Sequence, residues 1–426
     1  MARRKIREYD GKKILCQALQ KEFSLLLHST SLEVPFHSIL VTPQTDLEQL
    51  AIPFSTSVVK PDMLFGKRKQ YGLVLLDASP EEAKKWIQKY HHKPFTVGKA
   101  TDVLTHFLIE PFIAHQKEFY LSLTSGREGD LLQFSALGGA GIEERWNSVV
   151  SLQIPTGDLL SQEQLLSLFS EQVYLEKEIK EKIILFLQAI HKLFVDLHFT
   201  SLEINPFIFD EHGELHLLDL VAEVDDCASF KNLWPELSFP SPFGRLISPE
   251  EEYIQQLDQD SGASLKLTLL NPEGKVWNIL SGGGASIISL DCLSHAGLGN
   301  EIANYGEYSG NPTPEESYQY AKTVLELMMK TEANGKEGKV LLIAGAIANF
   351  TDVEKTFSGI VKALEEYALQ LRNSNTKIIV RRGGPNYEKG LELMRVCGEK
   401  LGLPMEVYGP EMPLAGIAQR MEVARN

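Results

Sequence analysis

The sequence predicts two domains of different classes: an α+β domain over residues 1–240 and a doubly wound α/β domain with a parallel sheet over residues 241–426. The length of 426 residues exceeds what one ordinary hydrophobic core supports, so two or three domains are expected. The boundary falls in LSFPSPFGRLISPEEEY, residues 237–253, because its three prolines and its glycine interrupt both helices and strand ladders.

The first half mixes short strands with a few helices, which is typical of an α+β domain. TSVVKPD and YGLVLLD are expected strands on either side of the basic turn MLFGKRKQ, and THFLIEPFIAH and KEFYLSLTS come next. LEINPFIFDEHGELHLLDL reads as two strands around a DEHG turn. Between these segments, apolar residues recur every three or four positions and predict a long helix with one buried stripe: Ile179, Ile183, Phe186, Ile190, Leu193 and Leu197.

The second half alternates strands with helices, which predicts the doubly wound α/β domain. Strands are expected near residues 276–280, 340–344, 377–380 and 405–408. Capping boxes in TPEE, residues 313–316, and TDVE, residues 351–354, predict two helix starts. In such a fold, ligands bind beyond the carboxyl ends of the strands.

Composition and charge exclude several classes of protein. With 43% hydrophobic and 23% charged residues the chain is globular, and its net charge of -15 argues against nucleic acid or an anionic membrane surface as the main partner. Its four cysteines are scattered without a CxxC pair, which argues against a disulfide framework or a zinc site. The basic start lacks the apolar stretch of a signal peptide, and no run approaches the about 18 apolar residues of a membrane-spanning helix. We therefore expect a soluble, cytoplasmic protein.

One polar group falls on the two strands around the DEHG turn. Glu203, Asn205 and Asp219 share a face if these strands pair, because residues two apart in a strand point to the same side. Carboxylate and amide oxygens are suitable ligands for Mg²⁺. A polar edge on a surface hairpin is the alternative interpretation.

Two further segments carry charges that suit a nucleotide. Lys60 lies on an expected strand, and Gly66, Lys67, Arg68 and Lys69 form a basic turn that can fix phosphate oxygens. Glu110 and Glu118 lie eight residues apart and can pair with ribose hydroxyls or neighbouring cations. Taken singly, a basic turn is usually a solvated loop, and surface acids are the favoured interpretation of the two glutamates.

The order and spacing of these segments resemble the ATP-grasp half of the succinyl-CoA synthetase β-subunit family. Asn205 and Asp219 keep the fourteen-residue separation of that family. The resemblance implies Mg²⁺ on Asn205 and Asp219 and a catalytic role for Glu203. It also implies ATP bound by Lys60, Arg68, Lys69, Glu110, Pro111, Phe112 and Glu118.

The second half narrows the resemblance to the ATP-citrate lyase family, through FGR…PEE, SGASLKLTLLNPEGKVW, GGGAS, NYGEYSG, IANFT and RRGGPNY. It implies a flavodoxin-like domain of the CoA-ligase type, in which Arg382 is also catalytic. A second cation on Asp258, Ser261 and the Ala263 carbonyl is implied, with an ordinary polar loop as the alternative. The implied citrate ligands are Gly283, Gly284, Gly310, Asn349, Phe350, Thr351, Tyr367 and Arg382.

Elementary chemistry agrees with an anion at these positions. Arg382 follows the strand TKIIV, where a guanidinium can hold a carboxylate through two hydrogen bonds. Asn349, Phe350 and Thr351 precede an expected helix, whose N–H groups and dipole favour negative charge. Thr351 can instead be a simple N-cap. The glycine loop from Gly282 to Ser286 opens another helix and can accept an anion through backbone N–H groups.

The motif SHAGLGN, residues 294–300, resembles the GHAG signature around the phosphohistidine of the CoA-ligase α-subunit family. Here Ser294 precedes the histidine, and the motif ends the glycine-loop helix of a β-type domain, whereas the family places its phosphohistidine on the other subunit. We therefore expect His295 to contact terminal helix carbonyls.

The resemblance implies an enzyme subunit that binds ATP, Mg²⁺ and citrate, and that uses CoA to give acetyl-CoA and oxaloacetate. The phosphohistidine, most of the CoA site and the lyase step are expected on a separate CoA-ligase α-like and citrate-synthase-like subunit, in a hetero-oligomer with four of each chain. The alternatives are the β subunit of another acid-CoA ligase, for succinate or malate, and a non-catalytic citrate-sensing subunit.

Overall fold

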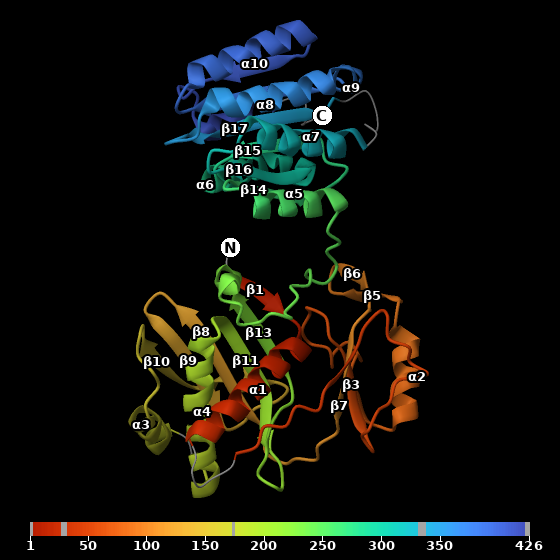
Figure 1. Ribbon diagram of the computed structural model, residues 1–426, viewed down its shortest axis with the longest axis vertical. Helices are drawn as coiled ribbons and strands as arrows, with labels where there is room; N and C mark the ends of the chain where they lie inside the picture. Colours follow the sequence, from red (N-terminus) through yellow and green to blue (C-terminus); the bar gives the residue numbers. More distant parts are fainter. Residues whose placement is uncertain (1–2, 27–31, 173–174, 331–337, 422–426) are drawn as a thin grey trace. The chain divides into compact units, whose positions relative to one another are not determined.

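The computed structural model describes residues 3–26, 32–172, 175–330 and 338–421. The chain divides into two compact units, Met1–Leu246 and Ile247–Asn426 (Figure 1). This division falls in the same proline-containing segment as the predicted boundary after residue 240. Within the described ranges, no helix combines the length and the apolar character that a bilayer crossing requires.

The first unit is built on two antiparallel sheets and a hairpin. The larger sheet has the order β1-β13-β11-β8-β9-β10, with β12 paired to β11, and the smaller has the order β2-β7-β3-β4. The larger sheet contains β1 (Arg3–Ile6), β8 (Phe119–Gly126), β9 (Gly129–Ser135), β10 (Val150–Pro155), β11 (Phe199–Phe209), β12 (Leu215–Leu217) and β13 (Leu220–Asp225). The smaller contains β2 (Ile39–Val41), β3 (Ser57–Pro61), β4 (Leu75–Ala78) and β7 (Phe107–Pro111), and the hairpin pairs β5 (Pro94–Val97) with β6 (Ala100–Val103).

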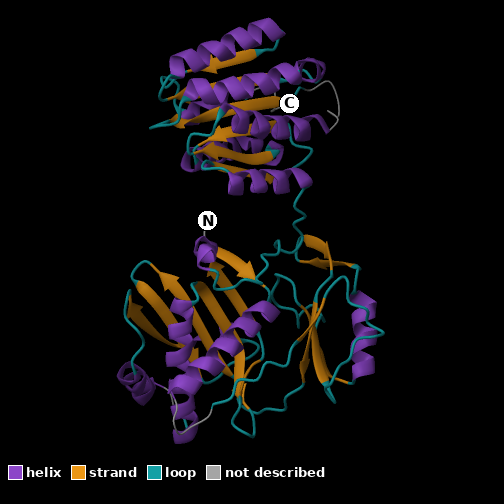
Figure 2. Ribbon diagram, viewed as in Figure 1, coloured by secondary structure: helices purple, strands orange, loops and turns teal. Residues whose placement is uncertain are grey.

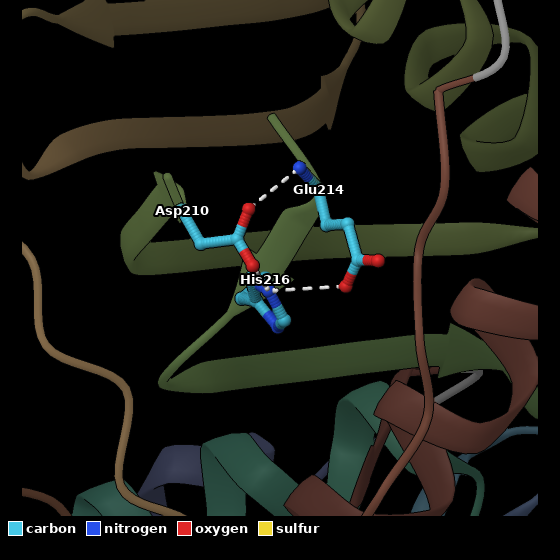
Figure 3. A group of neighbouring side chains, drawn as sticks. All are labelled: Asp210, Glu214 and His216. Carbon is cyan, nitrogen blue, oxygen red and sulfur yellow. Dashed lines mark hydrogen bonds and ion pairs between the residues drawn. The ribbon is translucent and has the colours of Figure 1, made fainter. Parts of the chain in front are cut away.

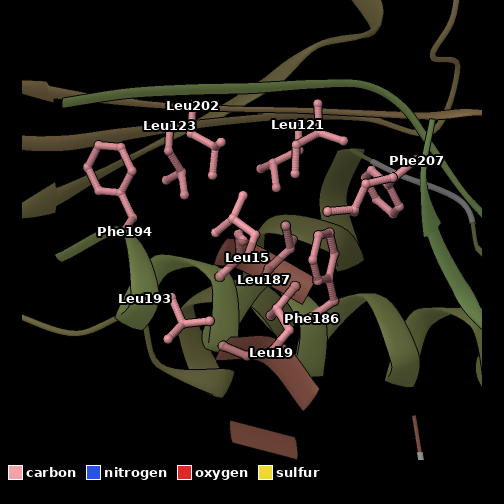
Figure 4. Close-up of a cluster of buried hydrophobic side chains, with 14 of the residues drawn as sticks. Leu15, Leu19, Leu121, Leu123, Phe186, Leu187, Leu193, Phe194, Leu202 and Phe207 are labelled. Atoms are coloured by element: carbon pink, nitrogen blue, oxygen red, sulfur yellow. The ribbon is translucent and has the colours of Figure 1, made fainter. Parts of the chain in front are cut away.

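Helices α1 and α4 cover one face of the larger sheet (Figure 1). The predicted stripe is confirmed, because Ile183, Phe186 and Ile190 are fully buried and the rest of the stripe is buried or half-buried. Figure 4 shows the resulting core, in which side chains of α1 and α4 meet leucines of β8 and β11. The helices of this unit are α1 (Glu8–Leu26), α2 (Pro80–Tyr90), α3 (Gln162–Gln172), α4 (Lys177–Asp196) and the short turns η1 (Ile142–Ser148) and η2 (Asp226–Lys231).

The second unit is a doubly wound α/β domain, as predicted. Its sheet has the order β14-β16-β15-β17-β18-β19, and all neighbouring strands are parallel except β14, which runs antiparallel to β16. Because β16 and β17 follow β15 in sequence but flank it on opposite sides, the strand order reverses at β15. The strands are β14 (Ser264–Leu269), β15 (Val276–Ser281), β16 (Asn304–Ser309), β17 (Val340–Ile347), β18 (Lys377–Gly383) and β19 (Met405–Tyr408).

Both faces of this sheet are covered (Figure 2). One apolar core joins the sheet to α7, α8 and α10, and a smaller one joins it to α6 and η5. The helices are α5 (Pro249–Asp260), α6 (Gly283–Leu293), α7 (Pro314–Lys330), α8 (Val353–Glu366), α9 (Ala368–Asn373) and α10 (Tyr387–Leu401). The short turns are η3 (Ser294–Leu298), η4 (Gly299–Glu301) and η5 (Leu414–Arg420).

The two predicted helix starts have different outcomes. The capping box at Thr313 is confirmed, because Thr313 and Glu316 exchange side-chain-to-backbone hydrogen bonds of 2.7 and 3.2 Å. The capping box at Thr351 is wrong, because the N-cap of α8 is Asp352, whose side chain accepts from the N–H of Lys355. Four strands of the second domain match their predicted positions, whereas β14 and β16 were not among the predicted strands.

Replacing Phe207 by alanine should destabilise the first unit. Phe207 is fully buried on β11, with its ring centroid 4.9 Å from that of Phe186 and 5.3 Å from that of Phe119, so its removal leaves a cavity. We expect the free energy of unfolding to fall by about 3–5 kcal/mol in urea denaturation followed by circular dichroism. Phe230→Ala is the matched control, because Phe230 is 81% exposed, and it should change stability by less than about 0.5 kcal/mol. Equal effects of the two substitutions would contradict this account.

Candidate functional site

A cavity of about 930 Å³ in the first unit is lined by residues of both its sheets. Its volume falls within the range of small-molecule sites. The cavity contains every residue of the first domain that the sequence analysis assigned to ATP, Mg²⁺ or catalysis. These are Lys60, Arg68, Lys69, Glu110, Pro111, Phe112, Glu118, Glu203, Asn205 and Asp219.

A buried carboxylate, Glu8, joins the cations on one side of this cavity. Glu8 is the first residue of α1 and is 4% exposed. Its carboxylate oxygens lie 2.8 Å from Lys12 Nζ, 2.6 Å from Lys60 Nζ and 2.7 Å from Arg68 Nη2. Burial alone would raise the pKa of Glu8, but these three cations hold it well below its ordinary value. Glu8 is therefore ionised and fixes the cations in place.

The other two acids of this cluster face Lys12 and Arg68. Both Glu110 oxygens lie 2.8 Å from Lys12 Nζ, and one lies 3.4 Å from Lys60 Nζ. Asp219 Oδ1 lies 2.8 Å from Arg68 Nη2, and the Asp219 side chain is 44% exposed to the cavity. The cluster thus holds three cations and three carboxylates, so its charges balance before any ligand arrives.

The predicted metal face is a set of oxygen donors on β11 and the turn before β13. The N–H of Asn205 donates to the Asp219 carbonyl at 3.0 Å, so the two residues lie opposite each other, as their pairing predicts. Asn205 Oδ1 accepts from the N–H of Gly139 at 2.7 Å. Burial raises the pKa of Glu203, and Asp219 and Glu143 raise it further. Carboxylate and amide oxygens are the ligand types that suit a hard divalent cation.

His216 lines the same cavity and belongs to a polar turn with Asp210 and Glu214 (Figure 3). Asp210 Oδ1 accepts from the backbone N–H groups of His212 and Glu214, and Asp210 Oδ2 lies 3.1 Å from His216 Nε2. These bonds shape the DEHG turn and return the chain toward Asp219. The turn therefore positions the predicted metal face.

In the second unit, most of the predicted citrate residues meet at the carboxyl ends of adjacent strands. The loops after β16, β17 and β18 are tied together by Asp352, whose N–H donates to Asn311 at 3.0 Å and whose carboxylate accepts from Asn386 at 3.0 Å. This edge lies at β15, where the strand order reverses and where ligands bind in such sheets. The residues brought to it are Gly283, Gly284, Gly310, Asn349, Phe350, Thr351 and Arg382.

Arg382 differs from its neighbour Arg381 in how its charge is compensated. All three nitrogens of the Arg381 guanidinium donate to backbone carbonyls, those of Met412, Gly345 and Pro410. Arg382 is 3% exposed and donates through Nη1 to Ala346, but among the described residues its Nε has no acceptor and no carboxylate pairs with it. Burial lowers the pKa of Arg382. A buried guanidinium without a counter-charge is costly, so this position suits an anionic ligand.

At this edge, the N-termini of α6 and α8 are less accessible to an anion than the sequence suggested. Asp352 already places a carboxylate at the start of α8. Glu307 lies at the glycine loop, where a Cβ atom on Gly283 would be 3.1 Å from its Oε1, and it accepts from Tyr305 at 2.6 Å. The N–H of Gly282 donates to the Tyr308 carbonyl. The case for an anion therefore rests on Arg382 more than on backbone amides.

Tyr367 does not join the citrate group. It directly follows the last residue of α8, whereas Thr351 lies two residues before the first, and the 14 residues of α8 alone span about 21 Å. Its hydroxyl donates instead to Glu326 at 3.2 Å. We therefore leave Tyr367 out of the proposed citrate site.

The predicted second cation loop has internal partners. Asp258 accepts from the N–H of Leu265 at 2.7 Å and pairs with Lys266, and the hydroxyl of Ser261 donates to Glu316. Gly310 lies against Ala263, so this loop adjoins the citrate group. A cation on Asp258, Ser261 and Ala263 stays a prediction, because the polar-loop alternative accounts for the same contacts.

His295 contacts a helix carbonyl, since its Nδ1 lies 2.8 Å from the carbonyl of Asp291, one turn earlier. Sequence reasoning missed Glu8 and Lys12, which are central to the first cavity. Their only sequence signal is an i,i+4 pair of opposite charge at the start of a helix, a spacing that also occurs on solvated surfaces.

Comparison with known proteins adds an independent finding. A family model described as ATP-citrate synthase ATP-grasp domain matches residues 2–234, and one described as ATP citrate lyase citrate-binding matches residues 245–423. ATP-citrate synthase alpha chain protein 2 of Arabidopsis thaliana is 43% identical, with 98% of each chain covered. ATP-citrate synthase of Homo sapiens is 40% identical over 98% of this chain but only 38% of its own length. The structure of ATP citrate lyase from Methanothrix soehngenii, in complex with citrate and coenzyme A, has a TM-score of 0.87 at 43% identity, with 98% of this chain and 100% of that chain covered.

The Asp62 carboxyl should give the first unit a measurable pH dependence. Asp62 is 1% exposed and accepts from the N–H groups of Glu8 and Tyr9, and burial, with Glu8 adding to it, raises its pKa to about 6. Because this value exceeds the ordinary 3.8, its stabilising effect is complete below about pH 4 and is lost as the pH rises through about 6. The free energy of unfolding of the wild type minus that of Asp62→Asn should fall by up to about 3 kcal/mol between pH 4 and pH 7.

Urea denaturation at several pH values measures this difference. Asp158→Asn is the control, because Asp158 is exposed and its substitution should produce no such change. A difference that rises with pH for Asp62→Asn would contradict the assignment.

Proposed function

The chain belongs to the ATP-citrate synthase family, and we propose that it is the subunit that binds ATP and citrate in a two-subunit ATP citrate lyase. The observation that carries this proposal is the presence, in one chain, of two differently built polar sites. One is a cavity of about 930 Å³ whose wall holds equal numbers of paired cations and carboxylates. The other is the buried Arg382 guanidinium, which has no carboxylate partner among the described residues.

The cavity of the first unit is proposed as the ATP site. Lys60, Arg68 and Lys69 face the phosphates, and Glu110, Pro111, Phe112 and Glu118 hold the nucleoside end. Asn205 and Asp219 would hold Mg²⁺, which when bound neutralises phosphate charge. Glu203, on the same strand as Asn205, is the proposed catalytic carboxylate of this face. The contribution of the chain to phosphoryl transfer is positioning and charge compensation.

Arg382 is proposed to grip one carboxylate of citrate, with Asn349, Phe350, Thr351 and Gly310 around the remaining groups. Gly283 and Gly284 lie beside them at the start of α6. A planar guanidinium donates two parallel hydrogen bonds to a carboxylate, which fixes the orientation of the acid. A bound citrate carboxylate would also give the Arg382 guanidinium the counter-charge that it lacks.

The reaction requires a partner chain in this proposal. The γ-phosphoryl group leaves ADP and bonds to a histidine nitrogen of the partner, then passes to a citrate carboxylate oxygen and gives citryl phosphate. The CoA thiolate attacks that acyl carbon and releases phosphate, and citryl-CoA is then cleaved to acetyl-CoA and oxaloacetate. The Arabidopsis thaliana alpha chain is matched over 98% of its length, whereas the Homo sapiens relative carries further polypeptide outside the matched part, which supports the two-subunit form; its partner is proposed to be a CoA-ligase α-like and citrate-synthase-like subunit.

Substitutions in the two sites should have reciprocal effects on binding. Arg382→Ala should raise the Kd for citrate by about 10- to 150-fold, because it removes a charge-assisted pair, and should leave the Kd for Mg-ATP within about twofold. Lys69→Ala should raise the Kd for Mg-ATP by about two- to fivefold and spare citrate. Isothermal titration calorimetry of the chain with its partner measures both constants.

Arg395→Ala is the control for Arg382, because Arg395 is exposed and pairs with Glu392 on the outer surface of α10. It should change neither constant. Equal loss of citrate and ATP affinity in Arg382→Ala would contradict two separate sites.

A turnover assay separates the proposed function from its rivals. ADP formation by the chain with its partner and CoA should require citrate, and succinate or malate should not replace it. Turnover with succinate or malate would indicate another acid-CoA ligase. Citrate binding without any ADP formation would indicate a sensing subunit.

A further inference from the structure

Gly345 lies near the carboxyl end of β17, next to the guanidinium of Arg382. Its lack of a side chain leaves the space that this guanidinium occupies. A Cβ atom on Gly345 would lie 2.7 Å from Arg382 Nη1 and 2.7 Å from both the Cβ and the carbonyl oxygen of Ser281. Real Cβ atoms do not approach other atoms this closely, and the φ of Gly345 is not positive, so spacing rather than backbone conformation requires glycine here.

The same glycine separates the two neighbouring arginines. The carbonyl of Gly345 accepts from Arg381 at 2.6 Å, whereas its Cα hydrogens face Arg382. Arg381 is thereby tied to the backbone, and Arg382 is directed to the side of the sheet edge where Ser281 ends β15. One residue without a side chain thus permits two adjacent guanidinium groups to take different roles.

Tyr308 on β16 lies beside Ser281 in this part of the sheet. Tyr308 and Ser281 are each 2% exposed, and the two residues are register partners in the parallel pair of β15 and β16. Burial raises the pKa of Tyr308, whereas the Arg382 charge and hydrogen bonds with the side chains of Ser281 and Thr356 oppose this rise.

We propose that Gly345 is a positioning residue for Arg382, and that Gly345, Ser281 and Tyr308 form a slot that aims the guanidinium at a carboxylate of the bound acid. This inference rests on the proposed function and deepens it, because it names the residue that gives the citrate-binding arginine its orientation. The slot recognises a planar carboxylate through a fixed guanidinium plane, so it suits a polycarboxylic acid.

Gly345→Ala tests the slot in the chain assembled with its partner. The new methyl group would displace the Arg382 guanidinium, so the Kd for citrate should rise by about 10- to 100-fold while the Kd for Mg-ATP changes by less than about twofold. Gly416→Ala is the matched control, because the nearest atom to its new Cβ is the flexible Met412 sulfur at 3.3 Å. It should leave both constants unchanged.

An Arg382→Lys background separates positioning from general damage. Lysine lacks the planar guanidinium group that fills the slot. Adding Gly345→Ala to the Arg382→Lys variant should therefore weaken citrate binding by less than about threefold. The same large loss in both backgrounds, equal loss of ATP binding or unfolding of Gly345→Ala would overturn the slot. Unchanged citrate affinity in Gly345→Ala would also overturn it. Absence of citrate binding in the wild-type complex would instead overturn the proposed function, and with it the ligand of the slot.

Discussion

The ATP-grasp unit depends on one buried carboxylate, Glu8, that holds three cations at the edge of its cavity. Isolated buried charges are costly, so each member of this cluster is stable only because the others are present. Glu8 comes from α1, Lys60 from the smaller sheet and Arg68 from the loop after it. The cluster therefore joins the helix layer to the smaller sheet and fixes the cavity wall before any ligand binds.

The two units handle anions by different means. The first keeps its cations paired with its own carboxylates, so ligand binding there exchanges one set of ion pairs for another. The second leaves Arg382 buried without a counter-charge among the described residues, so an acid adds a pair rather than replacing one. A bound anion therefore stabilises the second site, because a buried unpaired charge destabilises this site when it is empty.

Sequence patterns were sufficient where a local physical rule decides the outcome. The α4 stripe and the parallel strands follow from periodicity, the pairing of Asn205 with Asp219 follows from strand register, and all are present. Glu8 was missed because two of its three cations, Lys60 and Arg68, come from distant positions, and its i,i+4 pair with Lys12 has a spacing that also occurs on solvated surfaces. Thr351 was misread because Asp352, the next residue, competes equally well for the cap. Tyr367 was carried over by resemblance, and only the length of α8 separates it from the site.

The ion pair between Arg68 and Asp219 has a consequence for what can occupy the cavity. A free inorganic anion would satisfy Arg68 but strand Asp219, and a free metal ion would do the reverse. A complex that carries both signs of charge replaces both lost contacts at once. The resting pair therefore favours a ligand that arrives with its counterion over a simple anion or a bare metal ion.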